Sequence, residues 1–196
     1  MLDYARRHWL PEPDFDTVVG KGFYGTVFAT SDPKRVVKMT KDPHEGLLMA
    51  AQLNWGLPGI VPCFGALHVV KDHWLLWKEM LTHVGVQAWF LKGAEDFIPA
   101  WRDLTRMIED GDPDLGKEPV DALYDMAEAC PALRDICETC VGLYDTYGMI
   151  PGDMHEGNFG CWDNYDQLIL FDAQLGALAD QVDYESCGTV EDDLDD

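Results

Sequence analysis

The sequence predicts an α+β protein in which a strand-rich first lobe is followed by a helical second lobe. Runs of β-branched residues separated by Gly and Asp-Pro turns dominate the chain up to about Leu81. Beyond Leu81, apolar residues recur at the three-and-four spacing of amphipathic helices. With 47% apolar residues in 196 positions, the chain can bury a core as one domain or as two small lobes.

The first lobe is predicted to contain five strands and one long helix, after a short helix over residues 2–9. The long helix covers residues 42–55, where apolar residues share one helical face. The predicted strands carry the segments TVVG, TVFAT, RVVKMT, GIVPCFGALHVV and HWLLWKEML.

The second lobe is predicted to consist mainly of two helices, over residues 96–110 and 120–147, separated by the loop GDPDLGKEP. The octapeptide PGDMHEGN follows the second of these helices as a loop. The short apolar runs FGCW and QLILF are expected to form a pair of strands around WDNYD.

The charge of the chain is strongly negative and unevenly distributed. The net charge is −22, and residues 135–196 carry 16 acidic residues and no Lys or Arg. Such a field repels nucleic-acid phosphates and attracts basic partners, so no direct nucleic-acid binding is expected. A protein that mimics DNA remains an alternative. Residues 186–196 are expected to form an acidic, mobile tail.

Neither a membrane segment nor a disulfide framework is expected. The chain has no run of 18 apolar residues, and its N-terminal segment lacks the apolar region of a signal peptide, so we expect a cytoplasmic protein. The six cysteines are not expected to form a disulfide framework, and Cys130, Cys137 and Cys140 are expected to be free and buried. A zinc site at Cys130, Cys137 and Cys140 is the alternative.

Gly20, Gly22 and Gly25 form a GxGxxGxV pattern that ends at Val27 and lies between two predicted strands. A glycine-rich hairpin can lay its backbone N–H groups close over phosphate oxygens, which larger residues would block. A Rossmann turn or a Walker loop would need a helix after the loop. An ordinary hairpin turn is the alternative.

Lys38 lies between Val37 and Met39 in a predicted strand. A lysine flanked by apolar residues either extends from an edge of the sheet or has a buried anionic partner. Glu45, at the start of the following helix, is the available partner. A glutamate at that position also favours the helix dipole without any catalytic role.

Asp153, Asn158 and Asp172 offer oxygen atoms suited to phosphoryl transfer. Asp153 and Asn158 are five residues apart in one loop, and Asp172 follows the apolar run LILF. Together they supply hard oxygen ligands for Mg²⁺ and one further carboxylate to orient a hydroxyl group. Phosphoryl transfer requires mainly positioning and charge neutralisation, so the ordered set indicates this chemistry.

From about Thr17 to Gly176 the chain resembles the protein-kinase-like superfamily. GKGFYGTV resembles the glycine-rich loop, VVK the strand with the ATP lysine, and GIVPCFG the strand after helix C. KEML resembles the hinge, GDMHEGN the catalytic loop and FDAQLG the metal-binding segment. The resemblance implies a bilobal protein-kinase-like fold. Residues 1–81 would form a five-stranded antiparallel N-lobe with one helix, and residues 82–185 a minimal, truncated helical C-lobe.

The resemblance also implies ATP and Mg²⁺ as cofactors and a role for each candidate residue. The catalytic residues would be Asp153 as the base, Lys38 on the phosphates, and His155 in place of a lysine that contacts the γ-phosphate. The metal ligands would be Asn158 and Asp172. The nucleotide would be bound by Gly20, Gly22, Gly25, Val27, Lys38, Glu45, Glu79, Met80 and Leu81.

More narrowly, GKGFYG, RVVK, GLPGIVP, DMHEGN and ILFDAQ resemble the small early serine/threonine protein kinases of T7-like bacteriophages. This resemblance implies transfer of the γ-phosphate of Mg-ATP to hydroxyl groups of host proteins in the bacterial cytoplasm. The negative charge predicts acceptors with basic residues near the target site. No membrane partner is expected.

The sequence departs from the kinase pattern in three ways. Pro151-Gly152 replaces the His-Arg of the catalytic loop, so switching by activation-loop phosphorylation is not expected. DAQ replaces DFG but keeps Asp172. Only 24 residues follow Asp172, which is too few for the usual activation segment and substrate-platform helices.

Two other functions remain open. One is a weak or inactive pseudokinase, an acidic module that sequesters a basic host protein. The other is a small-molecule kinase of the aminoglycoside-phosphotransferase type, because those enzymes carry an HGDxHxxN motif similar to GDMHEGN.

Overall fold

The computed structural model describes residues 2–70, 73–83, 94–109, 118–148, 150–152, 156–162, 167–172 and 174–175. These residues fall into two compact units. Unit 1 comprises residues 2–56 and 62–80, and unit 2 comprises residues 57–61 and the described residues from 81 onward. The predicted tail, residues 186–196, lies outside the described residues.

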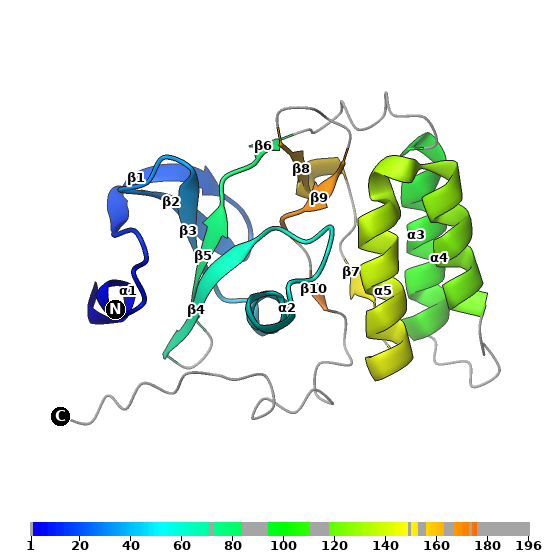
Figure 1. The fold of residues 1–196 in the computed structure, drawn as a ribbon, viewed down its shortest axis with the longest axis horizontal. Coiled ribbons are helices and arrows are strands. Elements are labelled where there is room, and N and C mark those ends of the chain that lie inside the picture. Colours follow the sequence, from blue (N-terminus) through cyan, green and yellow to red (C-terminus); the bar gives the residue numbers. More distant parts are fainter. Residues whose placement is uncertain are drawn as a thin grey trace. The chain divides into compact units, whose positions relative to one another are not determined.

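Unit 1 contains a five-stranded antiparallel sheet with the strand order β1-β2-β3-β5-β4 (Figure 1). The α+β first lobe with five strands and one long helix is therefore confirmed. The strands are β1 (Pro13–Lys21), β2 (Gly25–Thr30), β3 (Arg35–Thr40), β4 (Cys63–Val70) and β5 (His73–Glu79). The helices are α1 (Leu2–Arg7) and α2 (Pro43–Trp55).

The two helices of unit 1 lie against opposite faces of this sheet (Figure 1). Successive side chains of a strand point to opposite faces, so alternate side chains of β3 and β5 face α1 and α2. Val37 and Trp77, which are paired across β3 and β5, pack in one apolar cluster with Tyr4 of α1. Lys38 of β3 therefore lies on the other face, the face that α2 covers.

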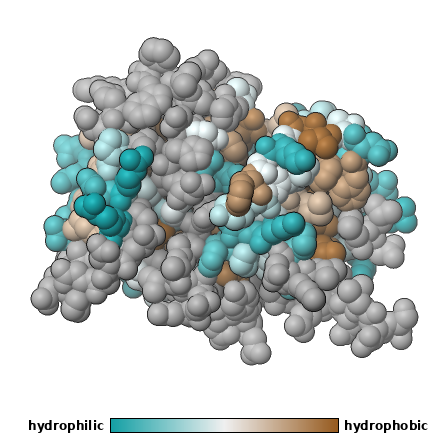
Figure 2. All heavy atoms as spheres, turned by 180° about the vertical axis from the view of Figure 1, so that it is seen from behind, coloured by the Kyte–Doolittle hydropathy of each residue, from teal (hydrophilic) through white to brown (hydrophobic). Residues whose placement is uncertain are grey.

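The edge strand β1 exposes several hydrophobic side chains. Phe15, Val18 and Val19 are all exposed. Figure 2 shows hydrophobic side chains reaching the surface on the side of the molecule where the five-stranded sheet lies. The strand that leads into the glycine hairpin thus keeps an apolar surface, which is unusual for an uncovered sheet edge.

Local sequence determines where α2 begins and how closely it packs. The Asp42 carboxylate accepts a hydrogen bond from the His44 N–H at 2.9 Å and caps the helix, and Gly56, with φ of 62°, ends it. A Cβ on Gly46 would lie 2.5 Å from the indole ring of Trp74 on β5. Glycine at position 46 therefore lets α2, with Glu45 in its first turn, lie directly on the sheet.

Unit 2 is built mainly from helices and carries short strands. Its helices are α3 (Ala94–Glu109), α4 (Glu118–Ala129), the 3-10 turn η2 (Pro131–Leu133), α5 (Arg134–Tyr147) and the 3-10 turn η3 (Glu156–Asn158). Its strands are β6 (Thr82–His83), β7 (Pro151–Gly152), β8 (Phe159–Cys161), β9 (Ile169–Leu170) and β10 (Gln174–Leu175). The predicted strand pair is confirmed, because Phe159 of β8 faces Leu170 of β9.

The prediction of one long helix over residues 120–147 is wrong. The chain forms α4 and α5 with a break at Pro131. Proline has no N–H to donate to the preceding turn, and its ring clashes with the carbonyl four residues earlier. The apolar periodicity continues across the break because both helices bury one face.

The predicted strand over residues 59–70 is partly wrong as well, because β4 begins only at Cys63. Residues 57–61 belong to unit 2, where Ile60 forms a parallel bridge with Leu170. A Cβ on Gly59 would lie 2.4 Å from the backbone nitrogen of Ile136, and φ of Gly59 is +72°. This close approach to α5 requires glycine.

Five cysteines are described, and all are free and buried, which confirms the prediction for Cys130, Cys137 and Cys140. Burial raises the pKa of Cys137 to about 12 and that of Cys140 well above its ordinary value. A metal-binding cysteine needs the thiolate form, which these surroundings disfavour. Within the described ranges, no group of three or more His, Cys, Asp or Glu side chains could hold a metal ion.

None of the helices in the described part of the chain is both long enough and apolar enough to cross a membrane.

Candidate functional site

The buried ion pair of Lys38 and Glu45 is the centre of the candidate site in unit 1. The Lys38 Nζ lies 2.8 Å from the Glu45 Oε2, and the two residues are 7% and 1% exposed. A lysine buried to this extent needs an anionic partner, and α2 supplies one. The predicted partnership between the strand lysine and the helix glutamate is present.

Lys78 of β5 is a member of this cluster that sequence reasoning missed. Its Nζ lies 2.5 Å from the Glu45 Oε1, and the residue is 4% exposed. Lys78 pairs across the sheet with Val36, so it lies on the same face as Lys38, two positions away. Its position after the apolar run HWLLW is the same kind of signal that marked Lys38.

Glu45 is ionised because two lysines surround it. Burial, the largest single influence, raises the pKa of Glu45, but Lys78 and Lys38 together hold it below its ordinary value. Cys63 lies close to the cluster, and burial raises the pKa of its thiol to about 11, so the thiol stays neutral. The cluster therefore presents one carboxylate shared by two lysines.

The glycine hairpin lies next to Lys38. Gly20 pairs with Val27, Val27 pairs with Lys38, and the hairpin closes through a 2.9 Å hydrogen bond from the Gly22 N–H to the Gly25 carbonyl. A Cβ on Gly25 would lie 2.5 Å from the Met39 carbonyl oxygen and 3.2 Å from the Cε of Lys38. Gly25 is therefore required for Lys38 to occupy its place.

Packing against the described residues does not require glycine at positions 20 and 22. A Cβ on Gly20 would make an ordinary contact with Val27 at 3.8 Å, and a Cβ on Gly22 would come no closer than 4.0 Å to the Gly25 carbonyl oxygen. The described glycines with positive φ are all elsewhere in the chain. The protein's own packing leaves room at both positions for a ligand to approach the backbone.

The residues that the sequence predicts as a hinge begin at Glu79, the last residue of β5. The Glu79 N–H donates to the Pro62 carbonyl at 3.0 Å, and the Met80 N–H donates to the Lys34 carbonyl at 2.8 Å. Both N–H groups are therefore engaged within unit 1.

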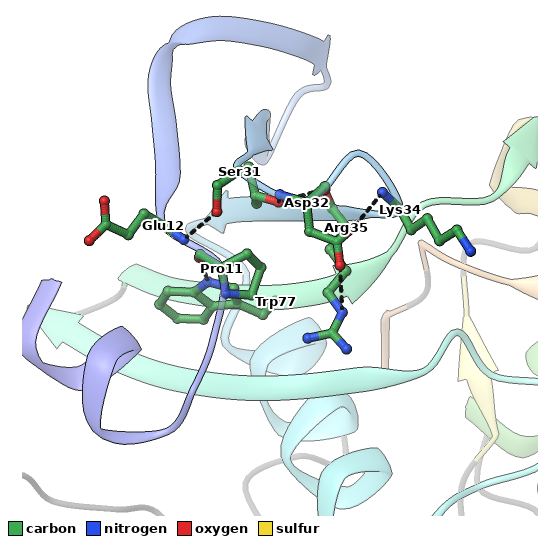
Figure 3. Close-up of polar contacts among 8 residues, drawn as sticks. Pro11, Glu12, Ser31, Asp32, Lys34, Arg35 and Trp77 are labelled. Carbon is green, nitrogen blue, oxygen red and sulfur yellow. Dashed lines mark hydrogen bonds and ion pairs between the residues drawn. The ribbon is translucent and has the colours of Figure 1, made fainter.

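Asp32 stabilises the turn between β2 and β3, which contains the Lys34 carbonyl that accepts the Met80 N–H (Figure 3). The Asp32 carboxylate accepts from the Lys34 N–H at 2.9 Å and lies 3.5 Å from the Arg35 Nε. On the other side of the close-up, the Trp77 indole N–H donates to the Pro11 carbonyl at 3.1 Å (Figure 3). The Asp32 contacts lie within the β2–β3 turn, and the Trp77 contact ties β5 to the segment between α1 and β1.

In unit 2, the predicted metal ligands Asn158 and Asp172 lie on neighbouring strand ends. The Phe171 N–H donates to the Asn158 carbonyl at 3.0 Å, directly beyond the pairing of β8 with β9. Asn158 is buried and Asp172 is partly exposed. Amide and carboxylate oxygens are ligands that Mg²⁺ accepts, so this donor set fits that ion.

Asp153 and His155 lie outside the described residues, but the segments on either side of them are described. β7 pairs with β10, so Gly152 faces Gln174, and Pro151 faces Leu175. The Pro151 carbonyl also accepts a buried hydrogen bond from the Trp101 indole at 3.1 Å. The PGDMHEGN loop thus begins and ends beside the segment that carries Asp172.

A groove runs between α3 and α4 in unit 2, with a volume of about 360 Å³. Its floor is apolar and includes Phe97, Leu104 and Met126, which are buried. Its rim carries the exposed acidic residues Asp103, Glu118 and Asp125. The Asp103 carboxylate lies 3.8 Å from the Arg106 guanidinium, an exposed pair of little energetic weight.

Comparisons with known proteins find a similarity of fold. No model of a known protein family matches the chain, and no curated protein matches it in sequence. Among solved structures, the chain is similar to the spectinomycin phosphotransferase APH(9)-Ia, in a crystal structure with ADP and spectinomycin, at 12% identity and a TM-score of 0.39. The match covers 81% of this chain and 64% of that one, so this chain spans less than two thirds of its length.

Proposed function

We propose that this protein is a phosphotransferase that moves the γ-phosphate of Mg-ATP to hydroxyl groups of proteins, as a serine/threonine kinase of the phage type. The observation that carries the proposal is the buried ion pair of Lys38 and Glu45 directly beside the glycine hairpin. A buried lysine held by a carboxylate, beside a hairpin whose Gly20 and Gly22 backbone is uncrowded, is suited to binding nucleotide phosphates.

The proposal assigns a part of the reaction to each unit. In unit 1, Lys38 contacts the α- and β-phosphates, and the backbone at Gly20 and Gly22 covers them. In unit 2, Asn158 and Asp172 would hold Mg²⁺, which would neutralise phosphate charge when bound. Asp153 orients the acceptor hydroxyl and accepts its proton on a carboxylate oxygen. His155 carries positive charge near the transferred group when protonated.

The acceptor is proposed to be a polypeptide with basic residues near the target hydroxyl. The α3/α4 groove has an apolar floor and three exposed acidic residues on its rim. A basic amphipathic segment fits both features. A second copy of this chain, with a net charge of −22, fits poorly, and so does the segment of residues 176–196, which contains no Lys or Arg.

Incubation of the purified protein with γ-labelled Mg-ATP and a bacterial lysate tests the proposal. The wild type should label lysate proteins, whereas Asp153→Ala and Asp172→Asn should not, although both should stay folded. Equal labelling by either variant would remove that residue's assignment. Tight binding of one basic protein without any label would select the sequestering module, and labelling of an added aminoglycoside alone would select a small-molecule kinase.

A further inference from the structure

Lys78 gives Glu45 a second partner that does not depend on Lys38. The two lysines reach different oxygen atoms of the same carboxylate, Lys78 at Oε1 and Lys38 at Oε2. They come from two neighbouring strands, β5 and β3, while Glu45 comes from α2. All three residues are at most 7% exposed.

A buried carboxylate must remain paired, because leaving it alone in a medium of low polarity is strongly unfavourable. If Lys38 were the only partner of Glu45, any ligand that drew the Lys38 ammonium group away would expose this unfavourable charge. With Lys78 at 2.5 Å, Glu45 stays paired whatever Lys38 contacts.

We propose that Lys78 is a positioning residue that neutralises Glu45 and thereby makes the charge of Lys38 available to the phosphates of a nucleotide. This inference rests on the proposed function, since it concerns the same nucleotide site. Lys78 acts through Glu45 and does not itself contact the ligand.

The other groups that face Glu45 do not take over this task. Cys63 on β4 is a neutral thiol. Asp42, at the N-terminus of α2, is a second carboxyl group, and burial raises its pKa above the ordinary value. Among the described groups that act on Glu45, the cations are Lys38 and Lys78.

The test compares the Mg-ATP affinity of the wild type with that of single and double variants of Lys78 and Glu45, measured by calorimetry on proteins shown to be folded by circular dichroism. Lys78→Met makes Lys38 the remaining lysine partner of Glu45, so Mg-ATP binding should weaken about tenfold, within the range of couplings between contacting residues. Adding Glu45→Gln to Lys78→Met releases Lys38 and should restore affinity to within about threefold of the wild type. Lys78→Arg keeps the charge and the donors and should also bind as the wild type does.

The outcomes separate this inference from the proposed function. A folded wild type that binds no Mg-ATP would overturn both. If the wild type binds Mg-ATP but the double variant binds it as weakly as Lys78→Met or more weakly, only the role of Lys78 is overturned. If Lys78 contacted the ligand or only supported the fold, removing Glu45 could not restore the affinity lost in Lys78→Met. If the double variant does not fold, weak binding by Lys78→Arg would likewise overturn the role of Lys78.

Discussion

At the scale of single residues, Gly25 decides whether Lys38 can occupy its buried position. A side chain at position 25 would collide with the Met39 carbonyl and the Lys38 stem. We predict that Gly25→Ala lowers the free energy of unfolding by about 1–3 kcal/mol, because the new methyl group overpacks the site. Urea denaturation measures this change.

Gly22→Ala is the matched control for this prediction, because its Cβ would come no closer than 4.0 Å to the Gly25 carbonyl. The change in the free energy of unfolding should stay within about 1 kcal/mol of the wild type. If the two variants lose the same stability, crowding at Gly25 is not the reason for glycine there.

Glu45 should make a contribution to stability that depends on pH. Although burial opposes its charge, the two lysines hold the pKa of Glu45 below the ordinary 4.5, so its contribution is present above pH 4.5 and lost as pH falls below it. Glu45→Gln removes the carboxylate that both lysines share and should cost about 3–5 kcal/mol of unfolding free energy at neutral pH.

Urea denaturation between about pH 7 and pH 3.5 checks this prediction. The difference between the wild type and Glu45→Gln should shrink below pH 4.5, whereas Glu128→Gln, an exposed change on α4, should alter stability by less than about 0.5 kcal/mol throughout. A difference that stays constant down to the lowest pH would show that Glu45 does not act through its charge.

Sequence reasoning found Lys38 and Glu45 but not Lys78. A lysine within an apolar run was recognisable at both positions, in VVKMT and in HWLLWKEML. Glu45 was predicted as the partner of Lys38 because it follows that lysine closely in sequence. Its contact with Lys78 spans 33 residues and depends on how α2 lies on the sheet, which no local pattern encodes.

At the scale of elements, Gly46 controls how closely α2 approaches β5. We predict that Gly46→Ala lowers the free energy of unfolding by about 1–3 kcal/mol, because its methyl group would lie 2.5 Å from the Trp74 ring and push the helix outward.

Gly142→Ala in α5 is the control for this helix substitution. No atom lies within 4 Å of its Cβ position, so alanine should stabilise the protein by up to about 1 kcal/mol through helix propensity. Thermal and urea denaturation of both variants give the comparison. A stabilising Gly46→Ala would mean that α2 does not need this close contact.

The elements also show where sequence patterns stop being informative. The strands of unit 1 and the β8–β9 pair were predictable, because β-branched runs and turn residues are local signals. The break between α4 and α5 was missed, because the apolar periodicity continues past Pro131. The early part of the predicted strand over residues 59–70 instead pairs with β9, and this partner is about 110 residues distant in the chain.

At the scale of the whole molecule, charge should govern the choice of acceptor. We predict that Asp103→Lys combined with Asp125→Lys, on the rim of the α3/α4 groove, weakens binding of a basic amphipathic peptide about tenfold and reduces its salt dependence. The affinity can be measured by fluorescence anisotropy at low and high salt.

The matched control changes the net charge equally at another surface of unit 2. Glu138→Lys combined with Asp145→Lys alters two exposed residues of α5. If this pair weakens peptide binding as much as the groove pair does, net charge alone attracts the peptide, and the groove has no specific role.

The most direct test of the central claim is the single-turnover rate of γ-phosphate transfer to a basic protein acceptor by the wild type, Lys38→Met and Lys34→Met. Lys34 is an exposed lysine in the turn before β3, so its loss should leave the rate unchanged. Lys38→Met should lower the rate at least about 100-fold, the usual effect of removing one electrostatic contact at a reacting centre. Transfer by Lys38→Met at the wild-type rate would contradict the account.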